Sequence, residues 1–186
     1  MTSISQALSN ARHKLKSNSP SPALDASVLL CHTLECSASH LIAWPEQELS
    51  ALQLSQFRDM VQQRLQGRPI AYLTGTKEFW SLSLKVSPDV LIPRPETETL
   101  VEFVLDRFGD REQLEIADIG TGSGAIACAL AFEHPRWRIT ATDASSAALR
   151  VAQANISAYE LANVRLLHGH WFEPLAGCYF DLVISN

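Results

Sequence analysis

The stretch Ala117-Asp118-Ile119-Gly120-Thr121-Gly122-Ser123-Gly124 decides the fold of this protein. An apolar run over residues 114–119 leads into its glycines, and an alanine-rich run over residues 125–133 follows them. The lengths and compositions of these runs predict a buried strand, a tight turn and a helix. A glycine-rich turn between a first strand and a helix lets a nucleotide-like ligand approach the backbone where side chains would clash. The alternative is a tight turn that binds nothing.

Strands and helices alternate after this turn, which predicts an α/β fold. Further strands are predicted over residues 138–143, 164–168 and 180–185, and a second helix over residues 146–159. Single helices between strands imply right-handed crossovers and a parallel sheet with helices on both faces. Both faces of a parallel sheet are normally covered by helices, and the fourth predicted strand ends at the terminus of the chain. We therefore expect the sheet to be incomplete at its C-terminal edge. We accordingly expect these 186 residues alone to be weakly stable and inactive.

The residues before this region predict a small helical domain over residues 1–75. Apolar side chains at helical spacing indicate helices over residues 4–15, 22–34 and 50–66, with a short turn over residues 37–43. Serine before the first of these helices is a good N-cap, and glycine after the last is a good stop signal.

A change from helical to alternating periodicity separates this domain from the α/β part. Alternation over residues 82–86 predicts a strand, and we interpret residues 76–92 as a β-hairpin linker. The α/β domain would then occupy residues 93–186. It would open with a helix over residues 96–108, whose inward face would carry Leu100, Val101, Val104, Leu105 and Phe108.

The charged residues argue against a nucleic-acid partner. The formal net charge is -5, and residues 1–80 contain seven Lys and Arg against six Asp and Glu. Residues 81–186 contain eight Lys and Arg against fourteen Asp and Glu. Nucleic-acid binders usually present a basic face, because neutralising phosphates supplies much of their affinity. We therefore expect no direct nucleic-acid partner, and solubility explains the acidic half.

The cysteines and the hydropathy pattern indicate a cytoplasmic protein without a bound metal. None of Cys31, Cys36, Cys128 and Cys178 forms a CxxC pair, and the histidines near the first two lack a familiar ligand spacing. Reduced thiols are the simpler account. The first residues lack the apolar segment of a secretory signal, and the longest uncharged run, residues 119–132, is too short and glycine-rich to cross a bilayer.

Two carboxylates accompany the glycine turn. Asp118 lies near the end of the first strand of the α/β part, and Asp143 ends the second. A carboxylate at the end of the second strand can accept both hydroxyl hydrogens of a ribose. Together with the glycines, this pattern predicts an adenosine site. These residues alone do not separate NAD, and hence a dehydrogenase, from S-adenosylmethionine.

The end of the fourth strand separates these ligands. That strand leads to Asn186, at the sheet edge where ligands of open α/β sheets bind. Here the sequence resembles the amino-methyltransferases whose fourth strand ends in Asn-Pro-Pro-Tyr. The resemblance implies that the chain is truncated after the Asn of this motif.

Two further segments narrow the resemblance to the release-factor glutamine methyltransferase family. The segment Gly67-Arg68-Pro69-Ile70-Ala71-Tyr72-Leu73-Thr74-Gly75, followed by Glu78-Phe79, resembles the interdomain segment of that family. The segment Pro93-Arg94-Pro95-Glu96-Thr97-Glu98 resembles the signature before its catalytic domain. The resemblance implies a Rossmann-like methyltransferase domain that transfers a methyl group from S-adenosylmethionine to the N5 amide of a release-factor glutamine. Residues 1–75 would help to hold the release factor.

The resemblance also assigns roles to single residues of the cofactor site. Asp118 would meet the ammonium group of the cofactor, and Asp143 would hold its ribose. The turn residues Gly120, Thr121, Gly122 and Gly124 would lie against the methionine end. Trp171 and Phe172 would contact the adenine, with ordinary core aromatics as the alternative. His170 departs from the family, in which an acidic residue commonly accepts from the adenine amino group, because a neutral imidazole accepts without a charge.

For the substrate, the resemblance makes Asn186 the catalytic residue that takes the glutamine amide. Arg94 and Glu96 would bind the substrate, although they and Glu98 are as well suited to stabilising the start of a helix. We expect a monomer whose partner is a peptide chain release factor. The alternatives are an amino-methyltransferase acting on adenine N6 or guanine N2 of nucleic acid, and a non-catalytic truncated module that binds cofactor or partner.

Overall fold

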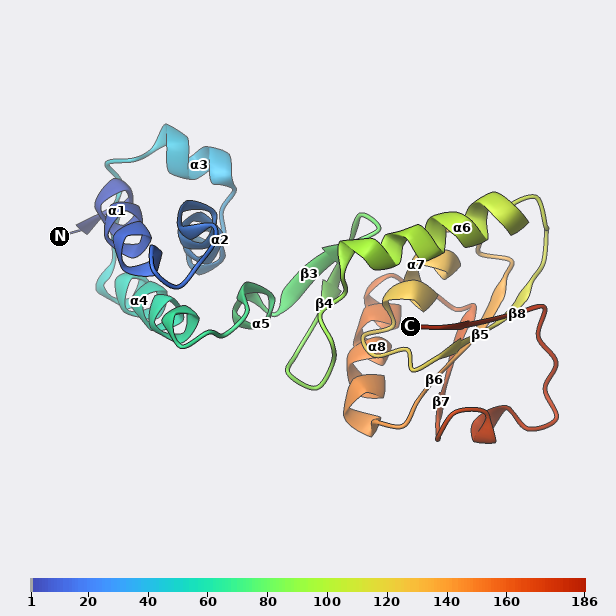
Figure 1. Ribbon diagram of the computed structural model, residues 1–186. Helices are drawn as coiled ribbons and strands as arrows, with labels where there is room; N and C mark the ends of the chain where they lie inside the picture. The colour runs from blue at the N-terminus through green and yellow to red at the C-terminus, as the bar shows by residue number, and fades with distance from the viewer. Residues whose placement is uncertain (1) are drawn as a thin grey trace. The chain divides into compact units, whose positions relative to one another are not determined.

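The computed structural model describes residues 2–186 and divides the chain into two compact units. The first unit is Met1–Thr74 and the second is Gly75–Asn186. Figure 1 shows helices in the first unit, and helices packed on a sheet in the second. The chain is therefore of the α/β class that the sequence predicts.

The first unit is helical, as expected. Its antiparallel strand pair and its helices are β1 (Thr2–Ser3), α1 (Ile4–Leu15), α2 (Pro22–Leu34), α3 (Ala38–Ala43), β2 (Glu48–Leu49), α4 (Ala51–Leu65) and α5 (Ile70–Thr74). Ser3 and Ser50 each form a capping box at the start of a helix, with Gln6 and Gln53 respectively. The turn predicted over residues 37–43 is instead a short helix, because the Ser37 side chain accepts a hydrogen bond at its first turn.

Helices α1, α2 and α4 enclose the core of the first unit. Ile4, Leu15, Leu29, Leu30 and Phe57 are almost fully buried there. The predicted stripe on α4 is confirmed, since its central residues are buried and its outer ones pack against the same core. This unit thus has a hydrophobic core made from its own residues.

The second unit follows the predicted alternation of strand and helix closely. Its elements are β3 (Thr76–Phe79), β4 (Leu82–Lys85), the 3-10 helix η1 (Pro95–Thr97), α6 (Glu98–Phe108), β5 (Glu115–Ile119), α7 (Ala125–Glu133), β6 (Arg138–Asp143), α8 (Ser146–Ala158), β7 (Val164–His168), the 3-10 helix η2 (Glu173–Leu175) and β8 (Leu182–Ser185). Strands β5 to β8 form one parallel sheet in the order β7-β6-β5-β8.

The strand order brings three strand ends together beside β5. Ile119 is in register with Thr142 on β6 and with Ser185 on β8, so these strands end at the same level. The chain leaves β5 towards β6 on one side and returns to its other side as β8. Ligands of open α/β sheets bind at such a reversal of strand order.

The prediction of helices on both faces of the sheet is wrong for the described residues. Helices α7 and α8 contact each other, and both contact β6 and β7, so they lie on the same face. The chain moves in one direction from β5 to β6 to β7, and right-handed crossovers in one direction place their helices on one side. On the opposite face, Leu175 of the short 3-10 helix η2, rather than an α-helix, packs on Ala117 and Ile119.

The hairpin that we interpreted as a linker belongs to the second unit. Phe79, Leu82 and Leu84 of β3 and β4 are almost fully buried in the same core as the inward residues of α6 and α7. The boundary between the units therefore falls at Gly75, before the hairpin. Alternation predicted a buried face here, but it did not indicate which core that face would join.

Candidate functional site

Two hollows meet at the carboxyl ends of the strands. The larger, of about 690 Å³, lies between the segment that begins at Leu91 and the glycine turn. The smaller, of about 330 Å³, lies between the end of β6 and the loop after β7. Gly120, Ser185 and Asn186 line both. The arrangement suits an elongated ligand with two chemically different halves.

The glycine turn has a backbone that favours glycine at three positions. Gly120, Gly122 and Gly124 have φ of 75°, 57° and 78°, in the left-handed region. A Cβ at Gly120 or Gly122 would meet no protein atom within 4 Å, so a ligand has room to approach the backbone there. A Cβ at Gly124 would lie 3.1 Å from the Ala152 Cβ, so this glycine allows close packing of the turn on α8.

Asp118 is a buried carboxylate at the base of the larger hollow. Its side chain accepts a 2.6 Å hydrogen bond from the Thr121 hydroxyl, and the residue is 2 % exposed. The pKa of Asp118 is raised to about 6, chiefly by burial and to a smaller extent by the nearby Asp143. The hydrogen bonds from Thr121 and from the Ala127 backbone act in the opposite direction and lower this pKa. A cationic group in the hollow would favour the ionised form of this carboxyl.

Asp143 holds the glycine turn as well as lining the smaller hollow. Its two oxygens accept hydrogen bonds from the Gly122 N–H at 2.9 Å and from the Ser145 N–H at 2.8 Å. A carboxylate has about four acceptor positions, so both oxygens can also accept from ligand hydroxyls. The sequence predicted the ligand role, and only the structure shows the bond to the turn.

The aromatic residues after β7 are not core residues. Trp171 is 72 % exposed and Phe172 is 61 % exposed, so the interpretation of both as core aromatics is wrong. Trp171 and His170 line the smaller hollow, whereas Phe172 is not among its lining residues. The structure thus places Trp171, but not Phe172, at the smaller hollow, and the adenine contacts of both stay predictions.

Asn186 is held at the junction of the two hollows. Its amide nitrogen donates a 3.0 Å hydrogen bond to the Thr97 hydroxyl. Arg94 and Glu96 line the larger hollow beside it. Glu98, in contrast, accepts from the Trp80 N–H at 3.0 Å and so supports the hairpin turn. We did not single out Thr97 from the sequence, although it lies inside the segment that carried the resemblance.

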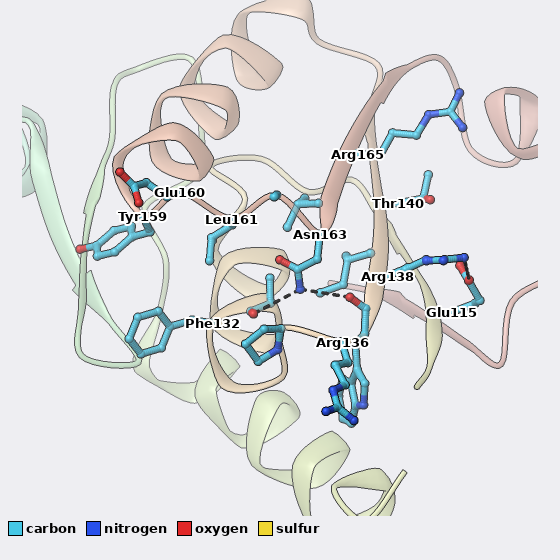
Figure 2. A pocket seen from close by; sticks show the side chains of 16 residues that line it. Glu115, Phe132, Arg136, Arg138, Thr140, Tyr159, Glu160, Leu161, Asn163 and Arg165 are labelled. Atoms are coloured by element: carbon cyan, nitrogen blue, oxygen red, sulfur yellow. Dashed lines mark hydrogen bonds and ion pairs between the residues drawn. The ribbon is translucent and has the colours of Figure 1, made fainter. Parts of the chain in front are cut away.

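Another hollow, of about 820 Å³, lies at the amino ends of the strands, away from the glycine turn (Figure 2). Within it, the Asn163 amide donates to the carbonyl oxygens of Ala131, His134 and Trp137, which closes the end of α7. Arg138 pairs there with Glu115 at 3.2 Å. These contacts are structural, and none of the predicted site residues lies there.

Within residues 2–186, no three His, Cys, Asp or Glu side chains are grouped so that they could hold a metal ion. Over the same residues, no helix has both the length and the apolar character needed to cross a bilayer.

Comparison with known proteins adds two family matches. Residues 6–75 match the family described as PrmC N-terminal domain, and residues 96–186 match the methyltransferase small domain. The solved structure described as delta-N METTL16 MTase domain has a TM-score of 0.50 and 22% identity, and the match covers 59% of this chain and 53% of that one. This likeness concerns the fold alone, and it agrees with a Rossmann-like methyltransferase domain.

Curated relatives match over nearly the whole chain. The release factor glutamine methyltransferase of Coxiella burnetii is 47% identical over 186 residues, which are 100% of this chain and 67% of the relative. That of Vibrio cholerae is 45% identical over 185 residues, which are 98% of this chain and 64% of the relative. The chain thus spans about two thirds of the length of these relatives. From this identity and coverage, we conclude that the chain belongs to the release factor glutamine methyltransferase family.

Proposed function

We propose that this protein transfers a methyl group from S-adenosylmethionine to the side-chain amide nitrogen, N5, of a glutamine in peptide chain release factors. The relatives, which are release factor glutamine methyltransferases, support the release factor as the substrate. The observation that carries the chemistry is the position of Asn186, which lines both hollows next to the glycine turn. A substrate amide held by Asn186 would lie where the two halves of the cofactor meet.

The lining of the hollows fits the two halves of S-adenosylmethionine. The methionine half would lie in the larger hollow, with its ammonium group near Asp118 and its backbone contacts at Gly120, Thr121 and Gly122. In the smaller hollow, Asp143 would accept from the ribose hydroxyls. Trp171 would lie against the adenine. Open space where a Cβ would stand at Gly120 and Gly122 supports this fit.

Asn186 would act by orienting the substrate amide. An amide nitrogen is a poor nucleophile because its lone pair is delocalised into the carbonyl, whereas S-adenosylmethionine supplies an electrophilic sulfonium methyl. The Asn186 amide nitrogen is engaged by Thr97, which leaves its oxygen to accept a hydrogen bond from the glutamine NH2. That bond would help to localise and aim the lone pair, and positioning of this kind can contribute about 7–11 kcal/mol. Arg94 and Glu96 would contact the substrate around this amide.

Label transfer from methyl-tritiated S-adenosylmethionine tests the proposal in the full-length protein. The acceptors offered would be a release factor, the same release factor with its accepting glutamine replaced, and nucleic acid. We expect label on the unmodified release factor only. Label on nucleic acid would instead identify an amino-methyltransferase acting on adenine or guanine, and binding without transfer would identify a non-catalytic module.

Asn186→Ala tests the catalytic assignment. We expect methyl transfer to fall by more than about 100-fold, because the substrate amide loses the group that orients it. The dissociation constant for S-adenosylmethionine, measured by calorimetry, should change by less than about twofold, since the cofactor contacts remain. Asn186→Asp is the matched variant, because it keeps an acceptor oxygen but loses the donor to Thr97. Turnover by Asn186→Ala within a few-fold of the unmodified protein would show that the assigned role is wrong.

We further propose that the protein acts as a monomer in the cytoplasm. Its relatives modify release factors, which act in translation, and this supports the location. The four cysteines are free thiols, as is usual for cytoplasmic proteins. Sedimentation velocity at increasing protein concentration would reveal a dimer if one forms.

A further inference from the structure

Asn155 is a buried polar residue outside the two hollows. It lies on α8, is 0% exposed, and uses both ends of its amide. The oxygen accepts from the Lys85 N–H at 2.6 Å, and the nitrogen donates to the Lys85 carbonyl at 3.0 Å. The same nitrogen donates to the Ser123 carbonyl at 2.8 Å. One side chain therefore joins the hairpin to the glycine turn.

Tyr159 repeats the hairpin contact one helical turn later. Its hydroxyl accepts from the Ser83 N–H at 2.6 Å and donates to the Ser83 carbonyl at 3.2 Å. Asn155 and Tyr159 together thus satisfy alternate backbone groups of β4 that β3 does not use. Side chains i and i+4 share one face of a helix, so these two side chains supply the hydrogen bonds that a third strand would otherwise make to this edge of the hairpin. The Tyr159 hydroxyl bonds to the hairpin at Ser83, whereas the Asn155 amide bonds both to the hairpin and to the glycine turn at Ser123, which is the difference between the two residues.

The glycine turn is held from two directions. Asp143 fixes the Gly122 N–H, and Asn155 fixes the carbonyl of the next residue, Ser123. Ser123 is itself buried, with 3 % exposed, so no solvent would replace the bond from Asn155. A buried carbonyl without a hydrogen-bond partner is unfavourable, so we expect the turn to shift when the bond from Asn155 is removed.

We propose that Asn155 is a positioning residue that holds the glycine turn in the shape needed to bind the cofactor and couples that shape to the hairpin. The inference rests on the proposed function, because it assumes that the turn binds S-adenosylmethionine. The hairpin begins directly after Thr74, the last residue of the unit expected to help hold the release factor. Because one amide group bonds to both Lys85 and Ser123, a displacement of Lys85 would act on Ser123.

The test compares Asn155→Ala with Tyr159→Phe in the full-length protein. Both variants remove an anchor of the hairpin from the same helix, but only the first removes a bond to the turn. Hydrogen exchange of the peptide over residues 120–124 is measured without cofactor, and the dissociation constant for S-adenosylmethionine is measured where both variants are fully folded. Asn155→Asp replaces Asn155→Ala if the latter does not fold, because it keeps the size and one acceptor oxygen but lacks the donor to Ser123.

We expect exchange over residues 120–124 to speed up, and the dissociation constant to rise by about tenfold, in the Asn155 variant alone. Tyr159→Phe should speed exchange only over residues 82–86 and leave the dissociation constant within about twofold of the unmodified protein. Equal effects of the two variants on the turn, or no effect of either, would overturn the inference. Failure of the unmodified protein to bind S-adenosylmethionine would contradict the proposed function instead, and the exchange data would still decide whether Asn155 holds the turn.

Discussion

The carboxyl group of Asp118, near the end of β5, is buried, and only 2 % of the residue is exposed to solvent. Burial raises its pKa to about 6 from the ordinary value of 3.8. Between about pH 4 and pH 6, the folded protein therefore holds a proton that the unfolded chain has lost. The free energy of unfolding falls as the pH rises through this window. Above about pH 6, the ionised Asp118 lowers the free energy of unfolding by its full amount. A shift from 3.8 to about 6 corresponds to about 3 kcal/mol, at about 1.4 kcal/mol per pKa unit.

Asp118→Asn should make the protein more stable and bind its cofactor less well. The uncharged amide avoids the cost of a buried charge, so the free energy of unfolding at pH 7.5 should rise by up to about 3 kcal/mol. Urea unfolding at pH 4.5 and pH 7.5 checks this, because the gain should shrink at the lower pH. An equal gain at both pH values would contradict the pKa argument.

The same variant should lose affinity for S-adenosylmethionine, since an ammonium group would lose its carboxylate partner. Affinity of the unmodified protein should likewise weaken below about pH 6, where Asp118 takes up a proton. Methylthioadenosine, which lacks the amino-acid part, is the matched ligand. Its affinity should not depend on Asp118.

At the scale of elements, the hairpin turn has a backbone that its residues disfavour. Trp80 and Ser81 have φ of 52° and 61°, although such two-residue turns favour Gly, Asn or Asp. Hydrogen bonds from the Trp80 N–H to Glu98 and from its indole N–H to Glu133 hold the turn in place. The turn thus depends on contacts with α6 and α7 rather than on its own sequence.

Ser81→Gly should stabilise the second unit. Glycine adopts a positive φ without the usual cost, and we expect a gain of about 0.5–1 kcal/mol after its larger unfolded-state entropy is subtracted. Ser83→Gly in β4 is the matched control, and it should destabilise by a similar amount because its strand backbone needs no glycine. Urea unfolding would measure both, and a loss of stability in Ser81→Gly would contradict the strain argument.

A buried ion pair joins two helices of the first unit. Asp25 in the first turn of α2 accepts a 2.7 Å bond from the Arg64 side chain at the end of α4, and it also accepts from the Ser19 and Ser21 hydroxyls. The Asp25 and Arg64 side chains are 8% and 16% exposed. Removing one charge of a buried pair leaves the other without compensation.

Asp25→Asn should therefore lower the free energy of unfolding by about 3 kcal/mol. Helical circular dichroism during urea unfolding is the measurement. Asp59→Asn, on the exposed side of α4, should change it by less than about 0.5 kcal/mol. Similar effects of the two substitutions would show that burial does not decide the contribution of Asp25.

At the scale of the whole molecule, the core of the first unit contains only its own residues. We expect residues 1–74 produced alone to keep their helices and to unfold cooperatively, with modest stability because so small a domain buries little surface. Circular dichroism during heating checks this. A spectrum without helical signal at low temperature would show that this core is insufficient.

Local patterns in the sequence predicted the elements well. Helix α7 and strands β6 and β7 have the predicted bounds, because the composition and the turn residues that delimit such elements act over a few residues. The three glycines of the turn were recognisable for the same reason. The resemblance to the family depended on short segments of this kind, and the relatives confirm it.

The sequence by itself thus determined most of the longer helices and strands, their order, the glycine turn and the family. Only the tertiary structure decided that α7 and α8 share one face, that the hairpin joins the second core, and that Trp171 rather than Phe172 lines the smaller hollow. It also decided that Asn155 meets residues 32 and 70 positions away. Contacts at such separations depend on how the strands are ordered and which side each crossover takes, and no local periodicity records that choice.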